Sequence, residues 1–260
     1  MLCEDTRVTG RLLAHLGLKK PLQAYHDHNA ARVRPMALER LAQGALVALV
    51  SDAGTPLISD PGYRLVREAA AAGIAVTPLP GSSALLAALT VAGLPTDRFL
   101  FAGFLPPKAT ARRTAIAELK SVRATLVFYE SGPRLPATIG DLAAILGPRE
   151  AAVARELTKM HERVRRMNLD ELAQHYRRRA PDDMPKGEIA IVVAPPDDSP
   201  HTIADDELVA MLRDALGRLP LKSAVEEVVV GTGLPRNAIY RRALALKRRA
   251  RSADEPDDAE

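Results

Sequence analysis

The apolar residues in the first third of the chain alternate between short continuous runs and helical stretches. Ala45–Val50 is apolar throughout, Ile74–Leu79 is apolar except at Thr77 and Pro78, and a turn rich in Gly, Ser or Pro follows each of them. Tyr63–Ala72 and Ala84–Val91 have helical composition, and Gly73 ends the first of them. A run that is apolar at every position predicts a strand buried on both faces. The pattern therefore predicts repeated strand–helix units in an α/β fold with a largely parallel sheet.

A second α/β domain is predicted at residues 98–195, after a first domain at residues 1–97, because strands follow one another more closely there. Its expected strands and helices, in chain order, are Arg98–Phe104, Ala111–Leu119, Thr125–Tyr129, Leu135–Leu146, Ala151–Arg155 and Ile189–Val193. A linker rich in Pro and Asp, residues 194–200, follows. Residues 201–250 show only helical periodicity, and the acidic segment 251–260 is expected to be a disordered tail.

The composition narrows the class of protein. The chain has 260 residues, no Trp and a single Cys, which excludes an internal disulfide framework and a Cys-based metal cluster. No apolar run reaches the roughly 18–20 residues that span a membrane. The first residues lack the basic and apolar segments of a signal peptide. We therefore expect a cytoplasmic protein without a membrane partner.

The charge is distributed unevenly along the chain. The net charge is +4, yet residues 254–260 contain five acidic residues and no basic residue. Seven Lys and Arg residues fall between Arg236 and Arg251, after a turn at Gly231–Pro235 that follows an Ala- and Val-rich helix. Helix, Gly-containing turn and basic helix are the layout of a helix-turn-helix. The pattern is compatible with binding of a polyanion such as RNA and equally with a solvated surface.

The densest group of small, hydroxyl and acidic residues is Ser51–Gly62, directly after the first apolar run. Ligands of open α/β sheets bind at the carboxyl ends of the strands, and a twelve-residue loop is long for a simple connection. We therefore predict a ligand site in this loop. The turn Pro80–Ala84 has helix-start amides suited to an anion or a carboxylate, although a Ser cap alone explains it equally well.

Two histidines, His26 and His28, stand two residues apart within Tyr25–Asn29. This pattern favours substrate contact or proton transfer over metal binding, because no third ligand stands nearby in the sequence. The pair His161–Glu162 begins a zinc-protease motif that fails at Arg165. The sequence also has neither a phosphate-binding P-loop nor a dinucleotide fingerprint. We expect no metal, and the kinase, GTPase and dinucleotide-binding classes lose their main support.

Eight blocks occur in a fixed order along the chain. They are CEDTR (3–7), YHDHN (25–29), VSDAGTPLISDPGY (50–63), PLPGSSA (78–84), GLPTDRFLFAGFLP (93–106), FYESGPRL (128–135), RELTKMHE (155–162) and KGEIAIVV (186–193). Together they resemble the ribosomal RNA small subunit methyltransferase I family, which has the tetrapyrrole-methylase fold of class III S-adenosylmethionine (SAM) methyltransferases. The resemblance extends to about residue 250. It implies a homodimer that methylates a cytidine 2′-hydroxyl of 16S rRNA in the small ribosomal subunit and does not act on DNA.

The resemblance also implies roles for individual residues. The SAM pocket is expected to use Asp52, Ala53, Gly54, Thr55, Ile58, Ser83, Ala84, Tyr129, Glu130, Glu188 and Ile189. The residues expected to contact the substrate or move its proton are Asp5, Arg7, His26, His28, Glu156 and Lys159. An acid or an imidazole would be the base, and the pattern does not assign it to one residue. Arg7 or Lys159 would hold a phosphate or lower the pKa of the hydroxyl.

Three departures from the family pattern are visible. The family has a strand, a Gly-Asn-Leu-type loop and a helix ahead of CEDTR, so we expect a first domain that lacks a sheet strand and a chain of low stability or activity. Gly132 and Pro133 stand where the family has Pro and His, and Met167 stands where it has Gly. Two alternatives remain open at this point: a methylase of the same fold that acts on a small molecule such as a tetrapyrrole, and a truncated RNA-binding relative without activity.

Overall fold

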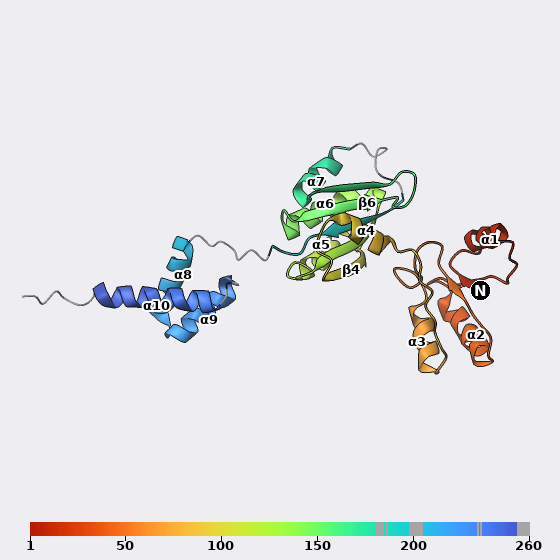
Figure 1. Cartoon of the computed structure of the whole chain (residues 1–260), viewed down its shortest axis with the longest axis horizontal. Coiled ribbons are helices and arrows are strands. Elements are labelled where there is room, and N and C mark those ends of the chain that lie inside the picture. Colours follow the sequence, from red (N-terminus) through yellow and green to blue (C-terminus); the bar gives the residue numbers. More distant parts are fainter. Residues whose placement is uncertain (180–184, 186, 198–204, 233, 235, 254–260) are drawn as a thin grey trace, which may run out of the picture. The chain divides into compact units, whose positions relative to one another are not determined.

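The structure is a computed structural model in which the chain forms two compact units, Met1–Pro196 and Asp197–Glu260 (Figure 1). It describes residues 1–179, 185, 187–197, 205–232, 234 and 236–253. None of the described helices is long and apolar enough to cross a membrane. Helix α10 (Arg236–Ala253) includes the first three residues of the expected acidic tail. The rest of that tail, residues 254–260, lies outside the described residues.

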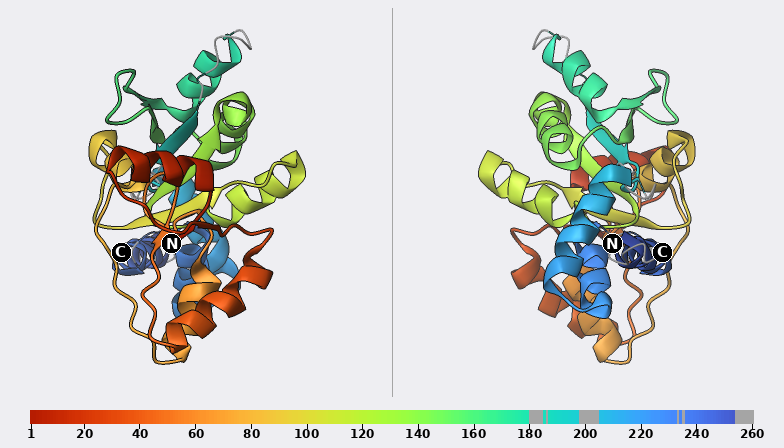
Figure 2. Two further views of the ribbon diagram at one scale, coloured as in Figure 1. Left: turned by 90° about the vertical axis from the view of Figure 1, so that its right-hand side faces the viewer. Right: turned by 90° about the vertical axis from the view of Figure 1, so that its left-hand side faces the viewer.

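The first unit begins with a small parallel sheet in the order β2–β1–β3. Its strands are β1 (Leu2–Cys3), β2 (Gln23–Ala24) and β3 (Leu49–Val50). The helices of this part are α1 (Thr6–His15), α2 (Ala30–Ala42) and α3 (Tyr63–Ala71), and α2 packs against α3 (Figure 2). Leu2, Tyr25, Val33 and Leu65 form its buried core. The parallel pairing places the carboxyl ends of β1 and β3 side by side.

The two apolar runs that predict buried strands in this region are largely exposed. The strand β3 takes up only the last two residues of Ala45–Val50, and Leu46 is fully exposed. Ile74–Leu79 forms no strand, and Figure 2 shows it as a plain trace between α3 and α4. Within the described residues β3 pairs with β1 alone, so its other edge is open. The strand prediction at Ala45–Val50 is wrong in extent and the one at Ile74–Leu79 is wrong altogether. A strand becomes buried on both faces only where other elements pack against both faces.

An extension ahead of Met1 that brings an apolar strand to the open edge of β3 is expected to raise the free energy of unfolding by about 2 kcal/mol. The reason is burial of exposed side chains next to β3, such as that of Leu46, and burial of one such side chain contributes about 1.5–3 kcal/mol. The connection needs a dozen or more residues, because parallel neighbours are joined by a crossover. Guanidinium unfolding measures the effect. An equal gain from a matched extension with Ser at the apolar positions would contradict the prediction.

The larger sheet has the order β4–β5–β8–β6–β7. Its strands are β4 (Phe99–Phe104), β5 (Thr125–Ser131), β6 (Glu150–Arg155), β7 (Arg163–Asn168) and β8 (Glu188–Val193). Only β4 and β5 run parallel, and the other neighbours are antiparallel. The expectation of a largely parallel sheet therefore holds for the small sheet and is wrong for this one. The sequence pattern does not predict β7, because this edge strand carries three Arg residues and no apolar run.

Helices cover both faces of the larger sheet (Figure 1). The helices α5 (Ala109–Glu118), α6 (Leu135–Leu146) and α7 (Leu169–Arg177) pack on one face, and α4 (Ala84–Ala92) packs on the other. Side chains of β5 alternate accordingly, since Leu126 and Phe128 join the first core and Val127 joins the second. Ser83 caps α4 and holds its start at the edge of this sheet.

The second unit consists, in its described part, of α8 (Asp205–Arg218), α9 (Leu221–Thr232) and α10. Leu212, Val225, Val228 and Ile239 are the large residues of its buried core. The structure therefore agrees with the helical periodicity of this part of the sequence. Gly233 and Pro235, two residues of the predicted turn, lie outside the described residues.

Candidate functional site

Several strand ends meet at one edge of the larger sheet because β8 runs antiparallel to β5 and β6. Glu130 near the end of β5 pairs with Ile189 near the start of β8. Phe104 at the end of β4 pairs with Tyr129, and Glu188 precedes Ile189 at the start of its strand. The register therefore brings the four predicted cofactor residues of this sheet to the same edge.

The loop Ser51–Gly62 has a strained backbone and is tied to the turn ahead of α4. Leu57 and Ser59 have φ angles of 74° and 62°, a left-handed conformation that costs free energy in residues other than Gly. The Thr55 hydroxyl donates a hydrogen bond of 2.9 Å to the carbonyl oxygen of Ser82. The two loops that the sequence singles out, at Ser51–Gly62 and Pro80–Ala84, are therefore in contact.

The same loop also reaches both sheets. The backbone amide of Asp5, just after β1, donates to Asp52 Oδ1 at 3.2 Å. A Cβ placed on Gly103, which has a φ of 63°, would lie 3.6 Å from Ser59 Oγ. The first contact places the loop at the carboxyl end of the small sheet, and the second places it beside β4. The two predicted halves of the cofactor site thus meet in the structure.

An acidic cluster, formed by Glu4, Asp52, Asp60 and Glu188, lies at this meeting point. Burial raises the pKa of Glu4, and the negative charges of Asp60, Asp52 and Glu188 raise it further. Burial also raises the pKa of Asp60, with a contribution from the charge of Asp52. Carboxylates that repel one another in this way favour a cationic ligand, which relieves the repulsion. Glu4 and Asp60 are absent from the predicted site residues, although both lie within motif blocks that contain such residues.

An aromatic group stands next to the acidic cluster. The ring of Tyr129 lies edge-on to Phe101 and Phe104, with centroid distances of 4.8 and 5.7 Å. Burial raises the pKa of the Tyr129 hydroxyl, and the charges of Glu188 and Asp60 add to this effect. Carboxylates suit the ammonium and sulfonium groups of SAM, and aromatic rings suit its adenine. The donor set present at this edge therefore fits the predicted cofactor.

Asp5 and Arg7, predicted to act on the substrate, form an ion pair at the start of α1. Asp5 caps the helix and accepts hydrogen bonds from the backbone amide of Arg7 at 2.7 Å and from its guanidinium at 2.5–3.1 Å. The side-chain hydrogen bond from Arg7 lowers the pKa of Asp5 to about 2. A carboxylate with this pKa is a weak proton acceptor at neutral pH. The Arg7 side chain is 87% exposed and is available to a bound anion.

Glu156 and Lys159 lie in the loop between β6 and β7, where Glu156 and Thr158 have φ angles of 50° and 64°. Lys159 Nζ lies 3.2 Å from Glu156 Oε1. A Cβ on Gly187, just before β8, would lie 3.2 Å from the same oxygen. This loop is therefore beside the acidic cluster. In the described part of the chain, four residues other than Gly have a positive φ. Two of them are in this loop and two are in the Ser51–Gly62 loop.

His26 and His28 lie before α2. Their rings are 5.9 Å apart, and the backbone amide of His26 donates to Asn29 Oδ1 at 2.9 Å. The Nδ1 atom of His26 is buried and lacks a hydrogen-bond partner among the described residues. Their loop follows β2, which is the parallel neighbour of β1, so it begins beside Glu4 and Asp5. The structure thus places Asp5, Glu156 and Lys159 at or beside the acidic cluster, and the two histidines in the loop at the carboxyl end of the neighbouring strand.

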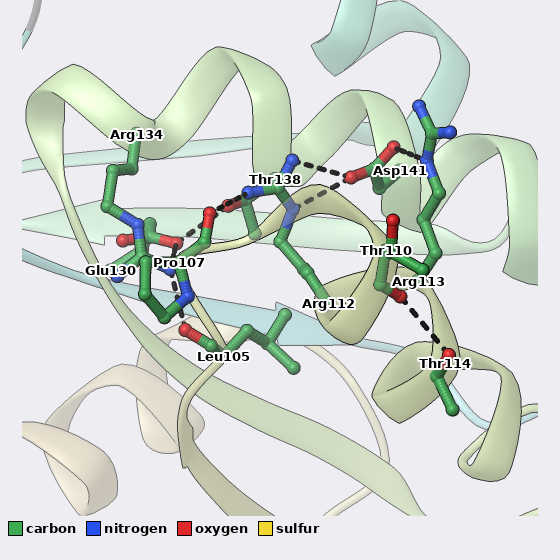
Figure 3. A network of polar contacts seen from close by, with 10 residues as sticks. All are labelled: Leu105, Pro107, Thr110, Arg112, Arg113, Thr114, Glu130, Arg134, Thr138 and Asp141. Carbon is green, nitrogen blue, oxygen red and sulfur yellow. Dashed lines mark hydrogen bonds and ion pairs between the residues drawn. The ribbon is translucent and has the colours of Figure 1, made fainter.

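The carboxylate of Glu130 belongs to a polar network with Thr138 and Arg134 (Figure 3). It is fully buried and accepts hydrogen bonds from Thr138 Oγ1 at 2.6 Å and from the Ser131 amide at 2.8 Å. Arg134 lies 3.3 Å from it and donates to the carbonyl oxygen of Leu105 at 2.6 Å. Glu130 can therefore offer only its backbone to a ligand at this edge. The same is true of Ile189, whose side chain is buried in the core.

The remaining predicted cofactor residues are accessible. Asp52, Ala53, Gly54, Ile58, Ala84 and Glu188 are exposed, and Thr55, Ser83 and Tyr129 are half-buried. They come from the Ser51–Gly62 loop, the start of α4, the end of β5 and the start of β8. These parts of the chain are distant in sequence and converge at the acidic cluster, as the prediction of a shared site requires.

Two family models match the chain. Residues 2–173 match the tetrapyrrole (corrin/porphyrin) methylases, and residues 202–247 match the RsmI C-terminal HTH domain. The chain is 48% identical over 246 residues to a ribosomal RNA small subunit methyltransferase I from Mesorhizobium japonicum, with 94% of this chain and 82% of the relative covered. A protein of the same name from Erythrobacter litoralis is 51% identical, with 94% and 85% covered. The one from Escherichia coli O157:H7 is 43% identical, with 93% and 84% covered.

Solved structures share the fold at low sequence identity. A diphthine synthase has a TM-score of 0.52 and 17% identity over 71% of this chain and 73% of its own. A conserved hypothetical protein from Aeropyrum pernix has a TM-score of 0.51 and 17% identity over 96% of this chain and 86% of its own. These similarities support the α/β architecture with C-terminal helices predicted from the sequence.

Proposed function

The chain belongs to the ribosomal RNA small subunit methyltransferase I family, within the tetrapyrrole methylases, and from this we propose that it methylates the ribose 2′-hydroxyl of a cytidine in 16S rRNA. The family identifies it as a SAM-dependent rRNA methyltransferase. The observation that carries the proposal is the identity of 42–51% to relatives of this name over more than nine tenths of the chain. The acidic cluster at the junction of the two sheets supports SAM as the cofactor.

We assign the cofactor to the edge where the strand ends converge. Asp52 and Glu188 would hold the cationic amino acid part of SAM or its ribose hydroxyls, and the rings around Tyr129 would contact its adenine. The Ala53–Thr55 segment, Ile58 and the Ser83–Ala84 helix start would line the pocket through backbone and small side chains. When bound, SAM supplies an electrophilic methyl group on its sulfonium.

The chain's own residues then position the ribose and accept its proton. Arg7 and Lys159 are exposed cations on either side of the acidic cluster and would hold phosphates of the RNA. Holding the hydroxyl in line with the methyl group can lower the barrier by about 7–11 kcal/mol. We favour Glu156 over Asp5 as proton acceptor, because Arg7 keeps the pKa of Asp5 near 2. His26 and His28 remain candidates for substrate contact from the loop that follows β2.

A methylation assay tests the activity directly. Unmodified small ribosomal subunits, free 16S rRNA and a porphyrinogen are incubated separately with the protein and with SAM carrying a labelled methyl group. A methyl group on a 2′-oxygen blocks alkaline cleavage at that nucleotide, because this oxygen is the attacking atom in the cleavage. A single alkali-resistant cytidine is expected. Label in a porphyrinogen and not in RNA would favour the small-molecule methylase, and SAM binding without transfer to any of these acceptors would overturn the proposal.

The Asp52→Ala variant is expected to bind SAM at least about tenfold more weakly, because loss of a charge-assisted hydrogen bond costs about 1.5–3 kcal/mol. Isothermal titration measures the affinity. Glu118→Ala is the matched control, since it removes an exposed carboxylate from α5, which packs on the face of the larger sheet opposite α4. An unchanged affinity in a well-folded Asp52→Ala protein would remove the Ser51–Gly62 loop from the cofactor site.

We further propose that the protein acts in the cytoplasm as a homodimer and has the small ribosomal subunit or its 16S rRNA as partner. The family resemblance supports these assignments. The basic α10 supports an RNA partner, because its exposed side chains include Arg241 and Lys247.

A further inference from the structure

The helix α10 has one face that is not used for packing. Ile239 and Ala243 are fully buried against the other helices of the second unit. At 3.6 residues per turn, Arg236, Tyr240 and Lys247 lie along a common line beside that buried face. All three side chains are exposed.

Tyr240 is an unusual residue for such a position. The chain has five Tyr, four Phe and no Trp. Leu244, one turn further along the same line, is half-buried and is the helical neighbour best placed to cover the ring. Tyr240 nevertheless leaves 43% of its surface exposed. An exposed aromatic ring between cationic side chains is the arrangement that single-stranded nucleic acid binds, with a base on the ring and phosphates on the cations.

The surrounding charges extend this arrangement. Arg236 lies 3.3 Å from Glu226 on α9, and both side chains are about half exposed. Arg241 Nε lies 3.4 Å from the Asn237 carbonyl oxygen, on a side of the helix about 100° around the axis from Tyr240. Lys247 stands two turns beyond Tyr240. Cations therefore lie on both sides of the ring along the helix.

We propose that this face of α10, made of Arg236, Tyr240 and Lys247, binds an unpaired stretch of RNA with one base stacked on the Tyr240 ring. The proposal rests on the proposed rRNA substrate. It specifies an unpaired strand because the major groove of an RNA duplex is too deep and narrow for side chains to read. Stacking on an aromatic ring needs a base that is free of its neighbours and accepts any of the four bases.

The Tyr240→Trp variant tests the contact in the full chain, because it introduces the only Trp. Its fluorescence is expected to be quenched by an unstructured 12-nucleotide RNA and to change little with a duplex RNA hairpin of equal length. Val230→Trp is the matched control, since Val230 is 86% exposed on α9 and is not part of the proposed face. Equal quenching at both positions, or none at Tyr240→Trp, would overturn the stacking contact.

The affinity for RNA and its salt dependence distinguish the contribution of base stacking from that of the charged side chains. Tyr240→Ala is expected to bind the single strand about tenfold more weakly with an unchanged salt slope, and Tyr240→Phe to bind normally. Arg236→Gln with Lys247→Gln is expected to reduce the slope by roughly 0.7 for each lost phosphate contact. A Tyr240→Ala protein of full affinity, or one that loses equal affinity for duplex RNA, would contradict the proposal. Methylation of 16S rRNA by the wild type is measured in parallel. If the wild type methylates the rRNA, such a failure concerns only this face of α10, and if it does not, the proposed function fails as well.

Discussion

Replacement of Asp141 by Ala is expected to lower the free energy of unfolding by about 3–5 kcal/mol, because it leaves a buried guanidinium without its partner. Asp141 on α6 accepts hydrogen bonds from Arg112 at 2.7 Å and from Arg113 at 2.8 Å (Figure 3). Arg112 and Asp141 are each only 6% exposed. Urea unfolding followed by circular dichroism measures the loss.

A double variant distinguishes the effect of losing the ion pair from the effect of losing side-chain packing. Arg112→Met combined with Asp141→Leu removes both buried charges and fills their space, so its stability is expected to lie within about 1 kcal/mol of the wild type. Asp170→Ala, on the exposed start of α7, is a control for the loss of a carboxylate. If Asp141→Ala unfolds at the same urea concentration as Asp170→Ala, the ion pair does not stabilise the fold.

The stabilising effect of Asp141 also depends on pH. Burial raises its pKa, but the hydrogen bonds and charges of Arg113 and Arg112 outweigh this, so its pKa is below the ordinary value. The group therefore binds a proton less readily in the folded state than in the unfolded state. Its stabilisation is complete above about pH 4, the ordinary pKa of Asp, and is lost as the pH falls through the folded-state pKa. The difference in stability between the wild type and Asp141→Ala should accordingly shrink as the pH falls below about 4.

This polar network also supports the site. Arg112 donates to the carbonyl oxygen of Pro107 at 3.4 Å, and Arg134 donates to that of Leu105 at 2.6 Å. The two guanidinium groups thus hold the segment that follows β4. Phe104, the last residue of β4, contacts the ring of Tyr129. Buried ion pairs on one side of the sheet therefore fix the aromatic group that we assign to the cofactor on its carboxyl edge.

Local patterns predict the elements of the larger sheet well. The predicted helix Leu135–Leu146 agrees with α6 at both ends, and the predicted strand at Ile189–Val193 differs from β8 by one residue. These segments have strong periodicity or continuous apolar runs and are buried by neighbours within the described chain. The continuous run Ala45–Val50 and the mostly apolar segment Ile74–Leu79 have similar patterns, but their burial depends on packing partners that a local pattern does not reveal.

The sequence predicts which residue types form the candidate site better than it predicts how their side chains are arranged. Motif blocks identify the loops that converge, and the structure agrees on the meeting of Asp52 with Asp5 and of Thr55 with Ser82. Sequence position does not reveal side-chain direction, so Glu130 is selected although its carboxylate points into the core. Glu4 is missed for the opposite reason, because its importance comes from charges that are 48 or more residues away.

Replacement of Arg241, Arg242, Arg248 and Arg249 by Gln is expected to weaken binding of 16S rRNA by about 10²–10³-fold at 0.1 M salt. Each phosphate contact releases counterions and contributes roughly 0.7–0.9 to the slope of log K against log salt. Four lost contacts would therefore flatten the slope by about 3. Arg241 and Arg242 are exposed on α10, and the other two continue the same helix.

Filter binding over a series of salt concentrations measures both quantities, and SAM affinity is measured in parallel. SAM affinity should not change, because the acidic cluster belongs to the first unit and α10 to the second. The matched control replaces Lys19, Lys20, Arg64 and Arg67, four exposed bases of the first unit, and removes the same total charge. If this control loses as much RNA affinity as the α10 variant, net charge alone explains the binding. If the α10 variant keeps both its affinity and its salt slope, the helix is a solvated surface and RNA is held by the first unit.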